Sequence, residues 1–118
     1  NKECCFKYGN CCYHENNFVD AKIYYNKAIN LGHFQARENL VEYYIKHEKD
    51  NIEKYFNHLI YLLEDCYKIL NPSDVKCIKK LNIYQTVLVE YYYSIRDYEN
   101  VVKCFEIAIK NNVKLFLL

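Results

Sequence analysis

The stretch that decides the fold is GNCCYHENNFVDAKIYYNKAINLGHFQARENLVEYY, residues 9–44. Its pattern predicts the end of one helix, a tight turn, a second helix, another turn and the start of a third helix. In the second helix, Ala21, Tyr25 and Ala28 stand at i, i+4 and i+7, so they share one face. The two alanines let a neighbouring helix approach closely, and the aromatic ring between them fills the remaining space.

This small–aromatic–small spacing, preceded by Gly9 in the first helix, resembles the tetratricopeptide repeat, a helix–turn–helix unit of about 34 residues. AINLGHFQARENL, residues 28–40, is similar to the Sel1-like variant of that repeat, in which a Gly ends one helix and an Ala four residues later begins the next. The spacing recurs 80 residues further on, at Val101, Phe105 and Ala108. The resemblance implies an all-α helix–turn–helix repeat solenoid.

The whole chain, residues 1–118, is expected to form a single domain of about six antiparallel helices. They are predicted as three pairs, near residues 2–31, 34–70 and 73–111, followed by an apolar tail at 113–118. HENN at 14–17 recurs as HEKD at 47–50, an offset of 33 residues. At that offset, however, the packing positions of the second helix become Lys54, His58 and Tyr61, so the middle repeat is predicted to be irregular.

Turn chemistry supports these boundaries. Asn17 and Asp97 are suitable N-caps for the second and sixth helices. Gly32 supplies the left-handed residue after the second helix. Asn71 and Pro72 are expected to open the fifth helix, because Pro is favoured at its first position.

Composition excludes several classes of protein. A chain of 118 residues with 52% hydrophobic and 17% aromatic residues can bury a core. Two Gly and one Pro are too few for a β-sandwich with many tight turns. With a formal net charge of +1 and no basic cluster, we expect no nucleic-acid partner. No apolar run is long enough to predict a membrane span.

The seven cysteines are an odd number in a chain that has a core, which favours reduced thiols in an intracellular, cytoplasmic setting. The chain lacks Met even at position 1, so we expect a processed chain or a fragment of a longer array. Its richness in Asn, Lys, Ile and Tyr is typical of AT-rich genomes. Similar repeats are common in such genomes, including those of large DNA viruses of amoebae, which suggests a viral protein.

The cysteines near the N-terminus invite a metal-site hypothesis. Cys4-Cys5 and Cys11-Cys12 lie seven residues apart, about 10.5 Å along a helix, so the two pairs cannot share one zinc ion. Cys11 and His14 could offer two ligands, with His47 from the next repeat as a third. Free Cys also behaves as a small hydrophobe, and we expect packing rather than metal binding. No cofactor is predicted.

We also expect no enzymatic activity. A cysteine nucleophile needs a histidine within hydrogen-bond reach and an oxyanion site. The sequence has no Gly-rich turn or strand-to-helix elbow that would build one. His33 and His58 are interpreted as a helix-boundary residue and a packing or surface residue.

In tetratricopeptide arrays the first helix of each repeat lines a concave groove that holds a peptide or helix. The resemblance assigns to this Tyr-rich groove, repeat by repeat, Phe6, Asn10, Tyr13 and His14; Asn39, Leu40, Tyr43 and Lys46; and Ile83, Val87, Glu90 and Tyr93. Tyrosine rings offer contact area and amides can pair with a peptide backbone. The alternative is that several of these residues pack against neighbouring helices.

One subclass of the family, which binds chaperones, holds a C-terminal carboxylate with Lys, Asn and Arg side chains. The corresponding residues here are Phe6, Asn10, Leu40, Ile83 and Val87, of which only Asn10 fits. We therefore predict an adaptor or scaffold that binds another protein by a different set of contacts. The rival is a structural protein, such as a virion component, that packs against itself or its neighbours. The apolar end, residues 113–118, favours the rival.

Overall fold

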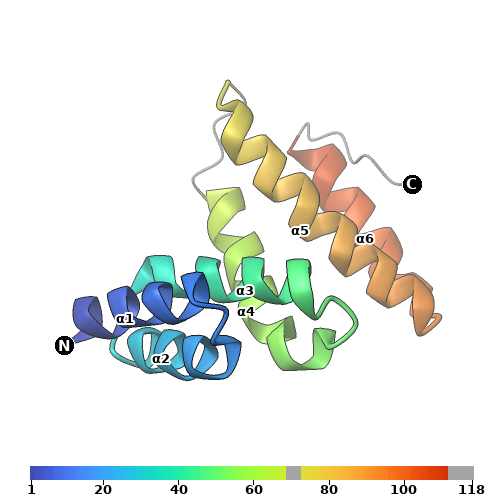
Figure 1. Cartoon of the computed structure of the whole chain (residues 1–118). Coiled ribbons are helices and arrows are strands. Elements are labelled where there is room, and N and C mark those ends of the chain that lie inside the picture. Colours follow the sequence, from blue (N-terminus) through green and yellow to red (C-terminus); the bar gives the residue numbers. More distant parts are fainter. Residues whose placement is uncertain (69–72, 112–118) are drawn as a thin grey trace. The chain divides into compact units, whose positions relative to one another are not determined.

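The computed structural model describes residues 1–68 and 73–111 (Figure 1). Within these ranges it consists of six α-helices and contains no strand. The helices are α1 (Lys2–His14), α2 (Phe18–Asn30), α3 (Phe34–His47), α4 (Ile52–Lys68), α5 (Val75–Ser94) and α6 (Tyr98–Lys110). The all-α prediction is confirmed. The predicted tail at 113–118 lies outside the described residues.

The chain divides into two compact units, residues 1–58 and 59–118. The first holds α1, α2, α3 and the start of α4, and the second holds the rest of α4 with α5 and α6. In the first unit α1 and α2 pack as a helical hairpin, and α2 packs on α3. In the second, α5 and α6 form another hairpin (Figure 1).

The start of α5 corrects one prediction. The helix begins at Val75, with Asp74 as its N-cap. The carboxylate of Asp74 accepts hydrogen bonds from the backbone N–H groups of Lys76 and Cys77, at 3.0 and 3.3 Å. An Asp side chain is a favoured N-cap, and the negative charge of Asp74 suits a helix N-terminus. Asn71 and Pro72, which were expected in this role, lie outside the described residues.

Close contact between α1 and α2 follows from Gly9. A Cβ atom built at Gly9 would lie 2.8 Å from Cδ1 of Tyr25 and 2.9 Å from its Cε1, closer than a Cβ atom in a protein approaches another side chain. Tyr25 is buried between Ala21 and Ala28, which are also buried. The small residues therefore provide the space that the large ring occupies, as the spacing predicted.

Three helices end in the same way, each with one left-handed residue. Asn16, Gly32 and Arg96 have φ values of 61°, 89° and 59° after α1, α2 and α5. In all three turns the residue that follows the left-handed one donates its backbone N–H to the carbonyl oxygen five residues before it. Examples are the bonds from Asn17 to Cys12 (2.8 Å) and from Asp97 to Tyr92 (2.9 Å). This is the Schellman motif, and it satisfies carbonyls that the helix end would leave unpaired.

The core of each unit is formed by apolar side chains facing inward. In residues 1–58 the largest fully buried side chains are Leu40, Val41 and Tyr55. In residues 59–111 they are Leu59 and Leu81. On α6, Ala108 is buried as expected, whereas Val101 and Phe105 are only half-buried. The α5–α6 hairpin therefore matches the α1–α2 hairpin only in part. Val89 occupies the position that corresponds to Gly9, and its side chain fills the space that Gly9 leaves for the ring of Tyr25 in the first hairpin.

No helix in residues 1–68 or 73–111 is long and apolar enough to cross a membrane.

Candidate functional site

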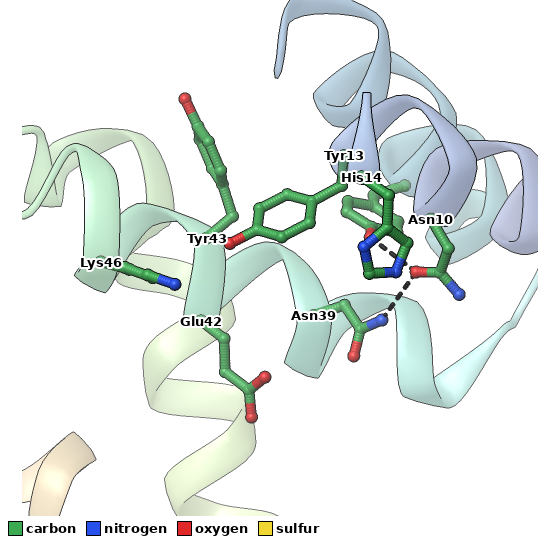
Figure 2. A pocket seen from close by; sticks show the side chains of 8 residues that line it. Asn10, Tyr13, His14, Asn39, Glu42, Tyr43 and Lys46 are labelled. Atoms are coloured by element: carbon green, nitrogen blue, oxygen red, sulfur yellow. Dashed lines mark hydrogen bonds between the residues drawn. The ribbon is translucent and has the colours of Figure 1, made fainter. Parts of the chain in front are cut away.

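A pocket of about 300 Å³ opens on the first unit, between α1 and α3. Figure 2 shows the side chains that line it, drawn from three helices. They are Asn10, Tyr13 and His14 of α1, Tyr25 of α2, and Asn39, Glu42, Tyr43 and Lys46 of α3. The lining is mostly polar, with two amides, an imidazole, a carboxylate, an ammonium group and three phenols.

Asn10 is the centre of the polar network. Its Oδ1 accepts one hydrogen bond from the Tyr25 hydroxyl at 2.6 Å and another from Asn39 Nδ2 at 3.0 Å (Figure 2). Asn39 Oδ1 in turn accepts from Gln35 Nε2 at 3.1 Å. This arrangement fixes both amides, and it leaves Asn10 Nδ2 and the second hydrogen of Asn39 Nδ2 to donate, because the first is used in the bond to Asn10.

The other wall is an aromatic cluster. The ring of Tyr43 lies 5.4 Å from Phe18, 6.2 Å from Tyr13 and 5.2 Å from His47, against which it stacks. The Tyr13 hydroxyl and His47 Nε2 are 3.0 Å apart, within hydrogen-bond distance. Only 4% of Tyr43 is exposed, so its ring is a fixed part of this wall.

An ion pair behind this wall holds Tyr43 in place. Lys22 Nζ lies 2.8 Å from Glu48 Oε2, and the Tyr43 hydroxyl donates a hydrogen bond to the same oxygen. Asn51 Nδ2 donates to Glu48 Oε1 at 2.9 Å. The hydrogen bonds from Lys22 and then Tyr43 lower the pKa of the Glu48 carboxyl to about 2, because they stabilise its ionised form. The hydrogen bond to Glu48 raises the pKa of Lys22 above its usual value.

Polar and charged groups lie along the rim of the pocket. His14, Glu42 and Lys46 are all exposed. Lys46 lies one turn after Glu42 on α3, and both line the pocket. The rim thus presents both signs of charge next to two amide donors. Such a surface is suited to a polar, extended ligand rather than to an apolar one.

The structure brings together six of the twelve residues assigned to the groove: Asn10, Tyr13, His14, Asn39, Tyr43 and Lys46. Phe6 lies outside this pocket, because it stacks on His33 with their ring centres 4.1 Å apart. Leu40 is buried in the core.

The third group of groove residues belongs to the second unit and is described there by itself. Glu90 is exposed, and Tyr93 is 65% exposed with its ring against Tyr98. Val87 is buried, and Ile83 is exposed on α5.

Two pocket residues were not predicted. Glu42 stands three residues after Asn39 and four before Lys46, so helical spacing alone could have placed it on the same face. Tyr25 was assigned to helix packing, and it also reaches the pocket through its hydroxyl. The sequence alone does not show whether the hydroxyl of a tyrosine that packs between helices also reaches a pocket.

The other histidines occupy boundary and packing positions, as interpreted. His33 is the N-cap of α3: its Nδ1 accepts from the Ala36 N–H at 3.2 Å, and its Nε2 lies 3.0 Å from Glu3 Oε2. His58 is half-buried, and burial, followed by the nearby charge of Arg37, lowers its pKa.

The cysteines do not gather around a metal-binding point. All seven are free thiols, and in residues 1–68 and 73–111 no group of three His, Cys, Asp or Glu side chains could hold a metal ion. His47, suggested as a third ligand for Cys11 and His14, instead pairs with Tyr13. Cys12 is buried, as packing would require.

Comparisons of the chain with models of protein families, with curated proteins and with solved structures find no match.

Proposed function

We propose that the chain is a non-enzymatic adaptor of the tetratricopeptide or Sel1-like kind, which binds an extended segment of a partner protein between α1 and α3. The pocket formed by Asn10, Tyr13, Asn39 and Lys46 carries the proposal. It requires no cofactor, and the partner is expected inside the cell.

The repeated hairpin supports the family assignment. The turn from α1 to α2 and the turn from α5 to α6 share the left-handed residue, the Schellman hydrogen bonds and an Asx cap. Asn17 and Asp97, 80 residues apart, have φ/ψ values of −86°/75° and −86°/73°. Each accepts from the N–H three residues on, at 3.3 Å. Two hairpins with one local design are typical of a repeat protein.

The polar lining supports a peptide as the ligand. A peptide backbone presents carbonyl oxygens at regular intervals. Asn10 Nδ2 and the second hydrogen of Asn39 Nδ2, which is not used in the bond to Asn10, are oriented donors for such oxygens. Asn10 and Asn39 are both half-buried, so these donors lie in a partly desolvated setting, where hydrogen bonds contribute more than in water. Lys46 adds a charge that would select partners with an acidic residue nearby.

Selection from a library of random twelve-residue peptides displayed on phage tests this proposal. Immobilised protein of residues 1–118 is expected to enrich a family of related sequences. Synthetic copies of the enriched peptides are then measured by fluorescence anisotropy against the wild type and against the double variant Asn39→Ala, Lys46→Ala. We expect binding to weaken about tenfold or more, as for removal of central contacts.

A matched control is available on α4. Asn57 and Lys54 are both exposed and lie outside the pocket, so Asn57→Ala with Lys54→Ala removes the same two side-chain types. The control should bind the peptides as the wild type does. If the pocket variant binds as tightly as the wild type, or no sequence family is enriched, the assignment of the groove is wrong.

A second candidate function is a structural protein, such as a virion component, whose helices pack against other copies. Exposed apolar side chains on α6 favour it: Val102, Ile107 and Ile109 are 53%, 44% and 74% exposed. Light scattering over a wide concentration range separates the two. The adaptor should remain a monomer of 14.3 kDa. Concentration-dependent assembly that Ile109→Lys abolishes would favour the structural role.

A further inference from the structure

A second pocket lies within residues 59–111 and is independent of the site between α1 and α3. Its volume is about 220 Å³, and its walls come from the last turns of α4, from α5 and from α6. Apolar side chains form most of the lining, among them Ile60, Leu63, Leu88 and Ile107. An apolar cavity of about 150 Å³ is already large enough to hold a benzene ring.

Besides Glu64, Asn100 and Lys103, the lining contains a hydrogen-bonded polar pair. Gln85 is only 2% exposed, and its Nε2 donates a hydrogen bond to the hydroxyl of Tyr67. Both residues line the pocket. Because the Tyr67 oxygen accepts in this bond, its own O–H hydrogen is left to donate elsewhere. Burial raises the pKa of Tyr67, so the hydroxyl keeps that hydrogen.

The carbonyl oxygen of the Gln85 amide lacks a hydrogen bond. Within the part of the chain that the structure describes, Gln85 Oε1 is buried and has no hydrogen-bond partner. Buried acceptors in native proteins are nearly always paired, so an unpaired one calls for an explanation. Because the terminal torsion of a Gln side chain is broad, a small rotation presents Oε1 to a molecule in the pocket.

We propose that this pocket binds a small uncharged ligand in which an amide group is attached to an aromatic or aliphatic ring. An amide N–H would donate to Gln85 Oε1, and the amide oxygen would accept from the Tyr67 hydroxyl. The ring would fill the space between Leu63, Leu88 and Ile107.

The charge of the ligand follows from the lining. The charged lining residues, Glu64 and Lys103, are exposed. Cys104 is buried in the wall, and burial raises the pKa of its thiol, so it is neutral as well. A charged group placed beside Gln85 would be desolvated without a counter-ion, which is strongly unfavourable.

Benzamide is the probe that tests the proposal, with acetophenone as its matched control. The two molecules have nearly the same shape, but acetophenone has a methyl group where benzamide has its N–H donors. Binding is followed by NMR through the methyl resonances of Ile60, Leu63, Leu88 and Ile107. Benzamide should shift these resonances with a Kd of about 1 mM, as expected for so few atoms. Acetophenone should bind about fivefold or more weakly, since it leaves Oε1 unpaired.

Two variants show whether the polar pair is responsible. In Gln85→Leu the preference for benzamide over acetophenone should fall to about twofold or less, because the Oε1 acceptor is gone. Tyr67→Phe removes the donor to the carbonyl oxygen that both molecules carry, so both should bind about threefold or more weakly. Lys110→Gln, at an exposed position of α6 outside the lining, should leave the affinity and the preference unchanged. Should Gln85→Leu fail to fold, the loss of benzamide affinity in Tyr67→Phe decides the question.

Three results would overturn the proposal. One is that acetophenone binds as tightly as benzamide, which would indicate an apolar cavity without amide recognition. Another is that the preference for benzamide survives in Gln85→Leu, or that Tyr67→Phe binds benzamide as tightly as the wild type. The last is that neither molecule shifts the methyl resonances at saturating concentration, which would mean that the pocket holds water alone.

Discussion

The ring of Tyr25 lies so close to Gly9 that no side chain can be added at position 9 without displacing it: a Cβ there would be 2.8 Å from Tyr25 Cδ1. Tyr25 cannot easily move aside, because it is buried and its hydroxyl donates to Asn10. The packing of the first hairpin and the polar network of the pocket therefore depend on the same contact.

Gly9→Ala tests this contact. The added methyl would overpack the hairpin, while Ala in place of Gly favours the helix by up to about 1 kcal/mol. We expect the overpacking to dominate, with a net loss of about 1–2 kcal/mol in the free energy of unfolding. Urea denaturation followed by circular dichroism measures the change.

The control is the same substitution in a Tyr25→Leu background. There the methyl has room, and Gly9→Ala should be neutral or stabilising. Equal losses in both backgrounds would show that the ring of Tyr25 does not set the requirement for Gly.

The left-handed residue Arg96 should be improvable. Positive φ is unfavourable for most L-residues, while Gly adopts it freely and Asn tolerates it. Arg96→Gly is therefore expected to stabilise the fold by about 0.5–1 kcal/mol, and Asn16→Gly to change it by less than about 0.5 kcal/mol. Thermal unfolding of the two variants beside the wild type measures this. A destabilised Arg96→Gly would contradict the shared design of the two turns.

Glu48 should make stability depend on pH in the acid range. Its folded-state pKa of about 2 lies below the ordinary value of 4.5. The ionised carboxylate therefore stabilises the fold above about pH 4.5, and this contribution is lost as the pH falls from 4.5 toward 2. Glu48→Gln should cost about 1–2 kcal/mol at pH 7 and flatten the dependence between pH 5 and 2.

Glu106→Gln, an exposed position on α6, serves as the control and should leave the pH dependence as in the wild type. The comparison uses urea midpoints at a series of pH values. If Glu48→Gln retains the full acid sensitivity of the wild type, the Lys22–Glu48 pair is not its source.

Tyr43→Ala is expected to destabilise the first unit by about 3–5 kcal/mol, because Tyr43 is buried among Phe18, Tyr13 and His47. It is therefore a poor probe of binding. Tyr43→Phe keeps the ring, removes the hydrogen bond to Glu48, and should lose no more than about 1.5 kcal/mol. Equal losses in the two variants, measured by urea denaturation, would contradict the buried position of the ring.

Local chemistry made much of the fold predictable. The caps at Asn17 and Asp97, the left-handed Gly32 and the spacing around Tyr25 act over a few residues, so the sequence shows them directly. The start of α5 was misplaced because Asp74 and Asn71 are both acceptable caps, and only packing chooses between such candidates.

The candidate site was predictable only in part. Asn10, Tyr13, Asn39 and Lys46 follow from helical spacing once the repeat is assumed. The pairing of Lys22 with Glu48 and that of Tyr67 with Gln85 join residues 26 and 18 positions apart. Which long side chains meet across such separations depends on the angles and distances between helices, and no periodicity in one helix encodes these.

The most direct test of the account is the response of side-chain amide resonances when the protein is titrated with a peptide enriched from the library. We predict that the ¹⁵N-labelled side-chain amides of Asn10 and Asn39 shift together as the peptide saturates, while that of Asn57 stays in place. Shifts that spare Asn10 and Asn39 and appear elsewhere on the protein would contradict the claim that the pocket between α1 and α3 is the binding site.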